Sequence, residues 1–117
     1  MVNETTVWVR LALPGFHRWP GATGVREYLA SRHRHLFHIE VEVAVTHDDR
    51  DVEFHDLQDL VREWWGPGAH EWDSSSCETI AGVLADTLLL EHGIQVNRVT
   101  ISEDGECGAT LTFKERS

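Results

Sequence analysis

Histidines gather at the start of one segment that is typical of a β-strand. His33 and His35 immediately precede the apolar-rich run at residues 36–45, and His17 lies sixteen residues before His33. Side chains alternate between the two faces of an extended strand, so His33 and His35 point the same way, about 6–7 Å apart. A metal ion could bridge them. The H-x-H spacing also occurs in exposed strands without a metal, so by itself it indicates a metal site only weakly.

Two further residues have side chains suited to chemistry. His70 lies in a loop rich in glycine and proline, where it is either a surface residue or a general acid or base near neutral pH. Glu103 precedes Asp104, so it is either a solvated carboxylate beside a hairpin or an anchor that accepts two parallel hydrogen bonds from a planar ligand. The residue types alone leave both interpretations of each position open.

Length and composition favour a single domain at residues 1–117. The formal net charge of −10 disfavours binding to nucleic acid or to an anionic membrane surface, because both require a basic protein surface. Only two cysteines are present, outside any C-x-x-C motif, and neither a signal-like N-terminus nor a long apolar run is found. We therefore expect a cytoplasmic protein.

The alternation of apolar and polar residues predicts four strands. Pro14-Gly15 is expected to break the first of them, and Asp104-Gly105 is a dipeptide favoured in the tight turn of a hairpin. The predicted strands lie at residues 5–12, 36–46, 96–103 and 109–114.

Two helices are predicted between the second and third strands. Apolar residues recur with helical period at residues 57–64, and Gly66 follows that run. The second helix begins at a serine cluster, where Ser75 and Glu78 have the spacing of a capping box, and it ends at Gly93. Residues 18–29 are expected to form an irregular loop with a short helix at 25–29.

The predicted order is β-β-α-α-β-β, an α+β fold in which two helices cover one face of a four-stranded antiparallel sheet. Exposed sheet edges are normally covered in proteins. We therefore expect a homo-oligomer in which neighbouring sheets continue one another.

The histidines, with their surroundings, resemble the superfamily of 6-pyruvoyl-tetrahydropterin synthase and 6-carboxy-tetrahydropterin synthase. In that family a histidine ends the first strand and an H-G-H motif begins the second, and these three histidines bind zinc. His17, His33 and His35 fall at those places, with Arg34 where the family usually has glycine. The resemblance covers nearly the whole chain and is weakest at residues 18–32. It implies Zn²⁺ as the cofactor and the tunnelling fold, assembled as a barrel of three subunits or as a dimer of such trimers.

The same resemblance implies roles for residues in the second half of the chain. His70 lies at the spacing of the family's catalytic histidine, seventeen residues after Glu53. Ser76 and Glu78 correspond to the P-T-x-E start of the second helix, which lines the substrate pocket. Glu103 corresponds to the glutamate that holds the pterin ring. The implied catalytic residues are thus His70 and Glu103, and the implied substrate-binding residues are Ser76, Glu78 and Glu103.

Two positions depart from the family pattern. Leu29 stands where the family has its catalytic cysteine, and Ala69 stands where an aspartate precedes the catalytic histidine. Cys77, at a helix N-terminus that can lower the pKa of a thiol, is one candidate replacement base. The alternative for Cys77 is a small buried residue at the start of a helix.

The implied function is a divergent zinc-dependent lyase of the 6-carboxy-tetrahydropterin synthase type. Its expected substrate is 7,8-dihydroneopterin triphosphate, on the route to queuosine and other 7-deazaguanine compounds. The missing cysteine and aspartate support an alternative, a tunnelling-fold zinc protein that binds a pterin or a purine-like ligand with altered or no catalysis. A third possibility is a structural or interaction protein in which the histidines are incidental.

Overall fold

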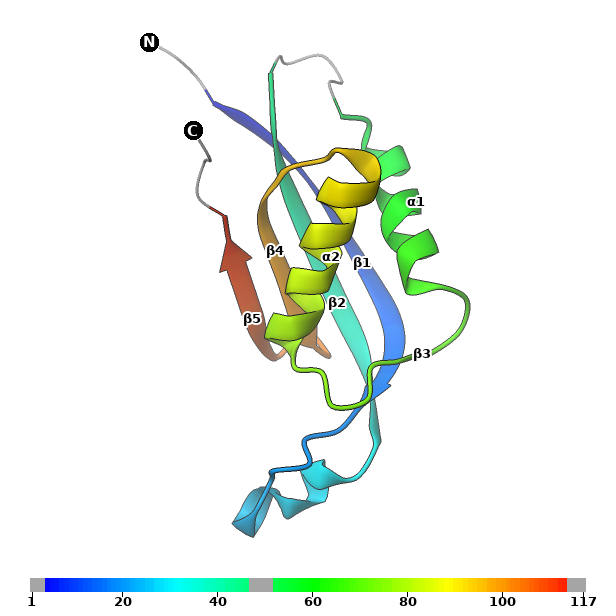
Figure 1. The fold of residues 1–117 in the computed structure, drawn as a ribbon, viewed down its shortest axis with the longest axis vertical. Coiled ribbons are helices and arrows are strands. Elements are labelled where there is room, and N and C mark those ends of the chain that lie inside the picture. Colours follow the sequence, from blue (N-terminus) through cyan, green and yellow to red (C-terminus); the bar gives the residue numbers. More distant parts are fainter. Residues whose placement is uncertain (1–3, 47–51, 114–117) are drawn as a thin grey trace.

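Two long antiparallel strands, β1 (Thr5–His17) and β2 (His33–Val45), form the centre of the fold in the computed structural model, which describes residues 4–46 and 52–113 (Figure 1). The 3-10 helix η1 (Gly24–Ala30) lies between these strands. The other elements are α1 (Phe54–Trp65), β3 (His70–Glu71), α2 (Cys77–His92), β4 (Val96–Glu103) and β5 (Cys107–Thr112). The predicted α+β class, both α-helices and all four predicted strands are confirmed. The last residue of the predicted strand at 109–114 lies outside the described part of the chain.

The sheet has five strands in the described residues, in the order β3-β1-β2-β4-β5. The prediction of four antiparallel strands was therefore wrong in number and order, because β3 pairs in parallel with the end of β1. This strand is only two residues long, too short to show the alternation that identifies a strand in a sequence. Its pairing of His70 with Gly15 depends on how the α1–α2 connection returns to the sheet.

Strand β1 continues through Pro14-Gly15, where the sequence predicted a break. Gly15 lets β1 pass close to the core, because a Cβ atom there would lie 2.9 Å from Trp65 Cζ2 and 3.0 Å from Phe37. The indole Nε1 of Trp65 also donates a hydrogen bond of 2.8 Å to the Pro14 carbonyl. Packing against these two buried rings therefore keeps the strand extended as far as His17.

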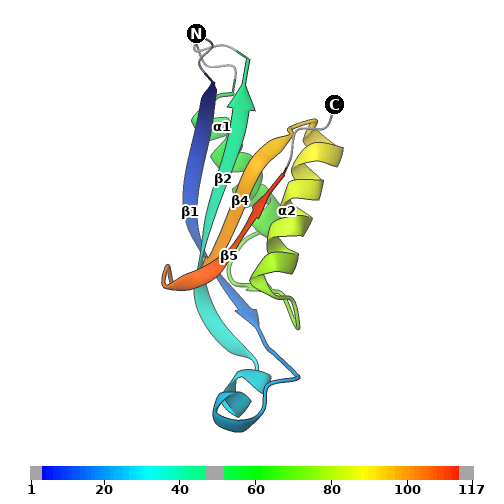
Figure 2. The same ribbon diagram turned by 90° about the vertical axis from the view of Figure 1, so that its left-hand side faces the viewer.

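Both α-helices lie on the same face of the sheet (Figure 2). α1 packs on β1, while α2 packs on β4 and β5. Alternate side chains of the strands point into this layer and bury the core, as the period of two predicts. The largest fully buried side chains are Trp65, Phe37, Ile39, Leu57, Ile80, Leu84, Leu88 and Ile101.

The opposite face of the sheet is polar. Arg10 pairs with Glu40 at 3.0 Å, and the hydroxyls of Thr100 and Thr110 lie 2.8 Å apart.

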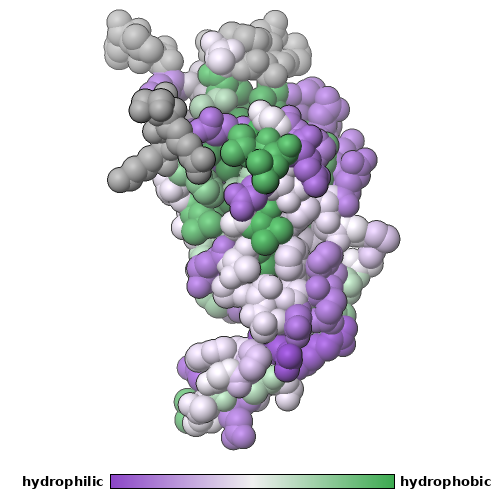
Figure 3. All heavy atoms as spheres, viewed as in Figure 1, coloured by the Kyte–Doolittle hydropathy of each residue, from purple (hydrophilic) through white to green (hydrophobic). Residues whose placement is uncertain are grey.

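The apolar side chains left exposed on α2 are Val83, Leu89 and Leu90, and Figure 3 shows apolar surface along that helix. None of the described helices is both long and apolar enough to cross a membrane.

The chain between β1 and β2 forms an arm that extends beyond the sheet and carries η1 (Figures 1 and 2). Its base is held by Arg18, whose Nε donates to Asp73 at 2.8 Å, and by Arg32, which pairs with Glu71 at 2.6 Å. Trp19, Val25 and Tyr28 on the arm are exposed. The arm therefore projects from the end of the sheet at which the histidines lie.

We predict that Gly15→Ala destabilises the protein by about 1–3 kcal/mol, because the new methyl group would overpack the rings of Phe37 and Trp65, which are both fully buried. Chemical denaturation followed by circular dichroism would measure this change. Gly82→Ala is the matched control, since a Cβ there meets only Leu111 at an ordinary 3.8 Å and a helix interior favours alanine. A Gly15→Ala protein as stable as Gly82→Ala would show that β1 does not depend on this close approach.

Candidate metal centre

Three histidines and one glutamate converge at the end of the sheet from which the arm projects. His17 and His33 are directly opposite each other in the β1–β2 register, and His35 follows two residues later on the same face of β2. Glu103 ends β4 opposite Phe37. One side-chain nitrogen or oxygen of each of the four residues lies within 4.8 Å of the others. The structure thus brings together the three predicted metal ligands and adds Glu103 to them.

Each of the three imidazoles is oriented by a hydrogen bond at Nδ1. His17 Nδ1 lies 3.0 Å from the Ser75 carbonyl, and His33 Nδ1 lies 2.9 Å from the Ser31 carbonyl. A carbonyl oxygen can only accept, so these two Nδ1 atoms carry a proton, and in the neutral ring Nε2 then keeps a free lone pair. This arrangement is typical of histidines that bind a metal through Nε2.

The Nε2 atoms of His17 and His35 are buried and make no hydrogen bond in the described structure. Each lies 3.3 Å from Oε2 of Glu103, an acceptor that cannot donate to them when ionised. Burying acceptors against one another without a donor costs free energy. A cation at their centre would satisfy all of them.

The spacing of these atoms suits a four-coordinate metal ion. Bonds of about 2.0–2.1 Å to nitrogen and oxygen in a tetrahedron place the ligand atoms roughly 3.4 Å apart. The two separations from Glu103 are both 3.3 Å. Imidazole with one carboxylate is a ligand set that suits divalent transition metals. These ligand types, with two separations of 3.3 Å and all four atoms within 4.8 Å of one another, fit a metal ion.

A cleft of about 350 Å³ opens beside this group, between the end of β4 and the start of α2. The predicted substrate-binding residues Ser76, Glu78 and Glu103 all line it. Ser76 caps α2, since its Oγ accepts a hydrogen bond of 3.2 Å from the Thr79 N–H. The residues lining the cleft also include His17, Arg18, Trp19, Ser74, Ser75, Cys77, Cys107 and Gly108. Glu103 belongs both to this cleft and to the metal group.

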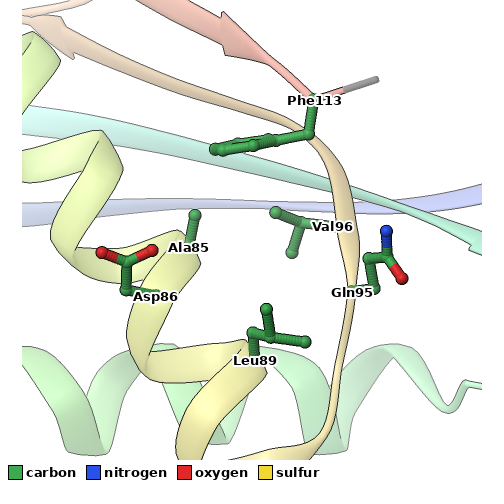
Figure 4. A pocket seen from close by; sticks show the side chains of 6 residues that line it. All are labelled: Ala85, Asp86, Leu89, Gln95, Val96 and Phe113. Atoms are coloured by element: carbon green, nitrogen blue, oxygen red, sulfur yellow. The ribbon is translucent and has the colours of Figure 1, made fainter. Parts of the chain in front are cut away.

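A second hollow lies near the other end of α2, against β4 (Figure 4). Its volume is about 70 Å³, and its apolar lining residues are Ala85, Leu89, Val96 and Phe113. It contains no cluster of histidine, cysteine and acidic side chains. Within the described residues, the group of histidine and acidic side chains close enough to hold a metal lies at the end of the sheet at which the histidines lie.

His70 does not join the metal group of its own chain. Its Nδ1 lies 2.6 Å from the Trp65 carbonyl, and its ring packs on Trp72 with centroids 4.3 Å apart. The ring of Phe37 contacts those of His17, His35 and Trp65, and Trp65 in turn contacts His70. Aromatic rings therefore connect His70 with the histidine group, but its predicted catalytic role stays a prediction.

Cys77 is not an activated thiol. Its side chain is buried, and this burial, followed by the negative charges of Glu103 and Glu78, raises the pKa of the thiol to about 12. The helix N-terminus was expected to lower this pKa, but desolvation disfavours the thiolate more strongly. The alternative interpretation, a small buried residue at a helix start, fits the structure.

The hydrogen-bond acceptors behind the histidines were not identified from the sequence. Two of them are main-chain carbonyls, of Ser31 and Ser75, which leave no signal in residue type. The third is the side chain of Asp104, 2.8 Å from His35 Nδ1. The Leu36 N–H and then His35 hold the pKa of Asp104 below its usual value. Asp104 was recognised only as part of a turn, although its position next to Glu103 was a signal.

No family model and no curated protein matches this chain. Among solved structures, an uncharacterized protein from Wolinella succinogenes has a similar fold, with a TM-score of 0.72 and 11% sequence identity. The match covers 97% of this chain and 100% of that protein. At this identity the likeness concerns the fold alone, so the whole arrangement of strands and helices recurs in another protein.

We predict that the protein purified without chelators contains about one equivalent of a divalent transition metal, as four convergent ligands imply. Elemental analysis by inductively coupled plasma mass spectrometry would measure it. His33→Ala should lose the metal, because it removes one of the ligands. His38→Ala is the matched control, since His38 lies on the same strand but on its opposite, exposed face. Equal metal content in both variants would rule out the proposed ligand set.

Proposed function

We propose that this chain is a divergent zinc-dependent protein of the pterin synthase superfamily, with the tunnelling fold. The observation that carries the proposal is the convergence of His17, His33, His35 and Glu103 beside a cleft lined by Ser76 and Glu78. Resemblance in sequence assigns the three histidines to zinc, and Ser76, Glu78 and Glu103 to the pterin. Their spatial clustering supports that assignment.

The proposed activity is that of a lyase similar to 6-carboxy-tetrahydropterin synthase, acting on 7,8-dihydroneopterin triphosphate on the route to 7-deazaguanine compounds such as queuosine. Bound zinc would polarise the side-chain hydroxyls of the substrate and acidify the neighbouring carbon. In the substrate complex the three histidines alone would hold the ion and leave its fourth position to the substrate, so that Glu103 would accept two parallel hydrogen bonds from the N–H edge of the pterin. Because Glu103 borders both the metal group and the cleft, it would place the ring next to the ion.

We further propose that the chain acts in the cytoplasm as a homo-oligomer, a trimer or a dimer of trimers, whose sites lie between subunits. Strand β5 is at one edge of the sheet, and most of β1 beyond its short pairing with β3 is at the other. Such edges favour pairing with another copy of the chain. An assembly of this kind would let His70 transfer protons at the metal group of a neighbouring subunit.

The alternative is a zinc protein that binds a pterin or a purine-like ligand with altered or no catalysis. Three residues favour it. Leu29 and Ala69 lack the groups that the resembling enzymes use for proton abstraction. Cys77 is protonated and buried, so its thiol does not replace the missing base.

Incubation of the zinc-loaded protein with 7,8-dihydroneopterin triphosphate separates these proposals. The lyase predicts a 6-substituted tetrahydropterin, detected by liquid chromatography and mass spectrometry. The binding protein predicts pterin binding by calorimetry without a product. Absence of both product and binding in the zinc-loaded oligomer would contradict the assignment of the cleft to pterins.

Glu103→Gln should weaken pterin binding by about 10- to 100-fold, because a charge-assisted pair of hydrogen bonds is lost. Calorimetry would measure the dissociation constant, and the metal content of the same sample would show whether the ion is retained. Glu106→Gln is the matched control, since Glu106 is an exposed residue of the adjacent hairpin turn. Equal pterin affinity in the two variants would remove Glu103 from the binding site.

A further inference from the structure

Asp104 connects the metal group to the turn between β4 and β5. Its Oδ2 lies 2.8 Å from His35 Nδ1, and its Oδ1 accepts a hydrogen bond of 2.9 Å from the Leu36 N–H. Its own N–H donates to the Leu36 carbonyl at 2.8 Å. One residue thus binds both the backbone next to His35 and the imidazole itself.

The backbone of Asp104 is in the left-handed region, with φ of 57°. Aspartate and asparagine are the residues other than glycine that adopt this conformation most readily. The following Gly105 also has a positive φ, of 73°, so both residues of the turn are fixed in this region. The turn fixes the backbone of Asp104, and the hydrogen bond from the Leu36 N–H holds the carboxylate that faces His35.

The carboxylate of Asp104 determines which tautomer of His35 fits the two contacts. Oδ1 accepts its hydrogen bond from the Leu36 N–H. Oδ2 is also an acceptor, so it forms a hydrogen bond with His35 only if Nδ1 carries a proton. An ionised carboxylate offers two acceptors and no donor, so it selects the form of His35 that is protonated at Nδ1. Main-chain carbonyls select the same form at His17 and His33.

We propose that Asp104 is a positioning residue for the metal site, which fixes the Nδ1-protonated tautomer of His35 and thereby leaves its Nε2 free to bind the ion. Among the described contacts of the three histidines at Nδ1, this is the one made by a side chain. The inference rests on the metal site of the proposed function and is independent of any chemistry on a pterin. It adds to that function a hydrogen bond to Asp104 that orients the metal ligand His35.

Asp104→Asn is the most informative substitution because it preserves size, shape and turn preference. Asparagine has one acceptor and one donor group. If the asparagine oxygen keeps the hydrogen bond from the Leu36 N–H, the asparagine NH₂ faces His35. This NH₂ donor favours the tautomer of His35 in which Nδ1 is unprotonated and Nε2 carries the proton. That proton would lie where the metal has to bind. The corresponding exchange in the serine protease triad places the catalytic histidine in the wrong tautomer in the same way.

Nitrogen-15 NMR of the histidine rings in the metal-free protein tests this directly. His35 is assigned by the signals that disappear in His35→Gln. We expect wild-type His35 to be protonated at Nδ1 at a pH where it is neutral, and Asp104→Asn to move that proton to Nε2. A wild-type His35 protonated at Nε2 would overturn the proposal, whether or not the protein acts on a pterin.

Zinc affinity, measured by competition with a chromophoric chelator, is the second readout. We expect Asp104→Asn to weaken zinc binding by about 10- to 100-fold, the usual effect of losing such an outer partner. Asp73→Asn is the matched control, because Asp73 also has a positive φ and a carboxylate bound to one donor, Arg18. Equal zinc affinity in these two variants would contradict the proposal.

Asp104→Gly covers the case in which the asparagine variant does not fold. Glycine suits the left-handed backbone and removes both acceptors without adding a donor. We expect both tautomers of His35 in this variant and zinc affinity between those of wild type and Asp104→Asn. Zinc affinity equal to that of wild type would show that the carboxylate does not position His35.

Discussion

His17 lies directly opposite His33 because β1 and β2 pair in one antiparallel register along thirteen residues of each strand. A slip by one residue would turn every side chain of β1 to the other face and remove His17 from the site. The apolar stripe that includes Val9 and Leu11 fixes this register, because those side chains have to remain in the core. The position of the metal group is therefore a consequence of core packing further along the same strands.

The electrostatics of the group link metal binding to folding. The buried Nε2 atoms of His17 and His35 have no hydrogen-bond partner in the described structure and each lies 3.3 Å from Glu103, so a metal cation at their centre would satisfy all three groups at once. A ligand that binds only the folded protein stabilises it in proportion to the logarithm of its concentration. The ion would thus stabilise the end of the sheet that carries the arm, in addition to any role in the chemistry of the site. The net charge of −10 makes a cation a favourable partner for this chain.

The sequence predicted the parts of the site that depend on local pattern. Strand alternation placed His33 and His35 on one face, and the resemblance to the pterin synthases added His17 to them and predicted Ser76 in the substrate pocket, where the structure has it lining the cleft. Features that depend on packing between distant segments could not be read in this way. They are the two-residue strand β3, the extension of β1 past Pro14-Gly15, the main-chain acceptors of the histidines, and the inclusion of Glu103 in the metal group.

X-ray absorption spectroscopy at the zinc edge of the loaded protein tests the central claim most directly, because it reports which atoms bind the ion. Three imidazoles and one oxygen predict four light-atom ligands at about 2.0–2.1 Å, with the outer scattering of histidine rings. The buried thiol of Cys77 lies in the adjacent cleft, so sulfur is the natural competing ligand. A sulfur shell at about 2.3 Å, or an ion surrounded by water without imidazole scattering, would contradict the account.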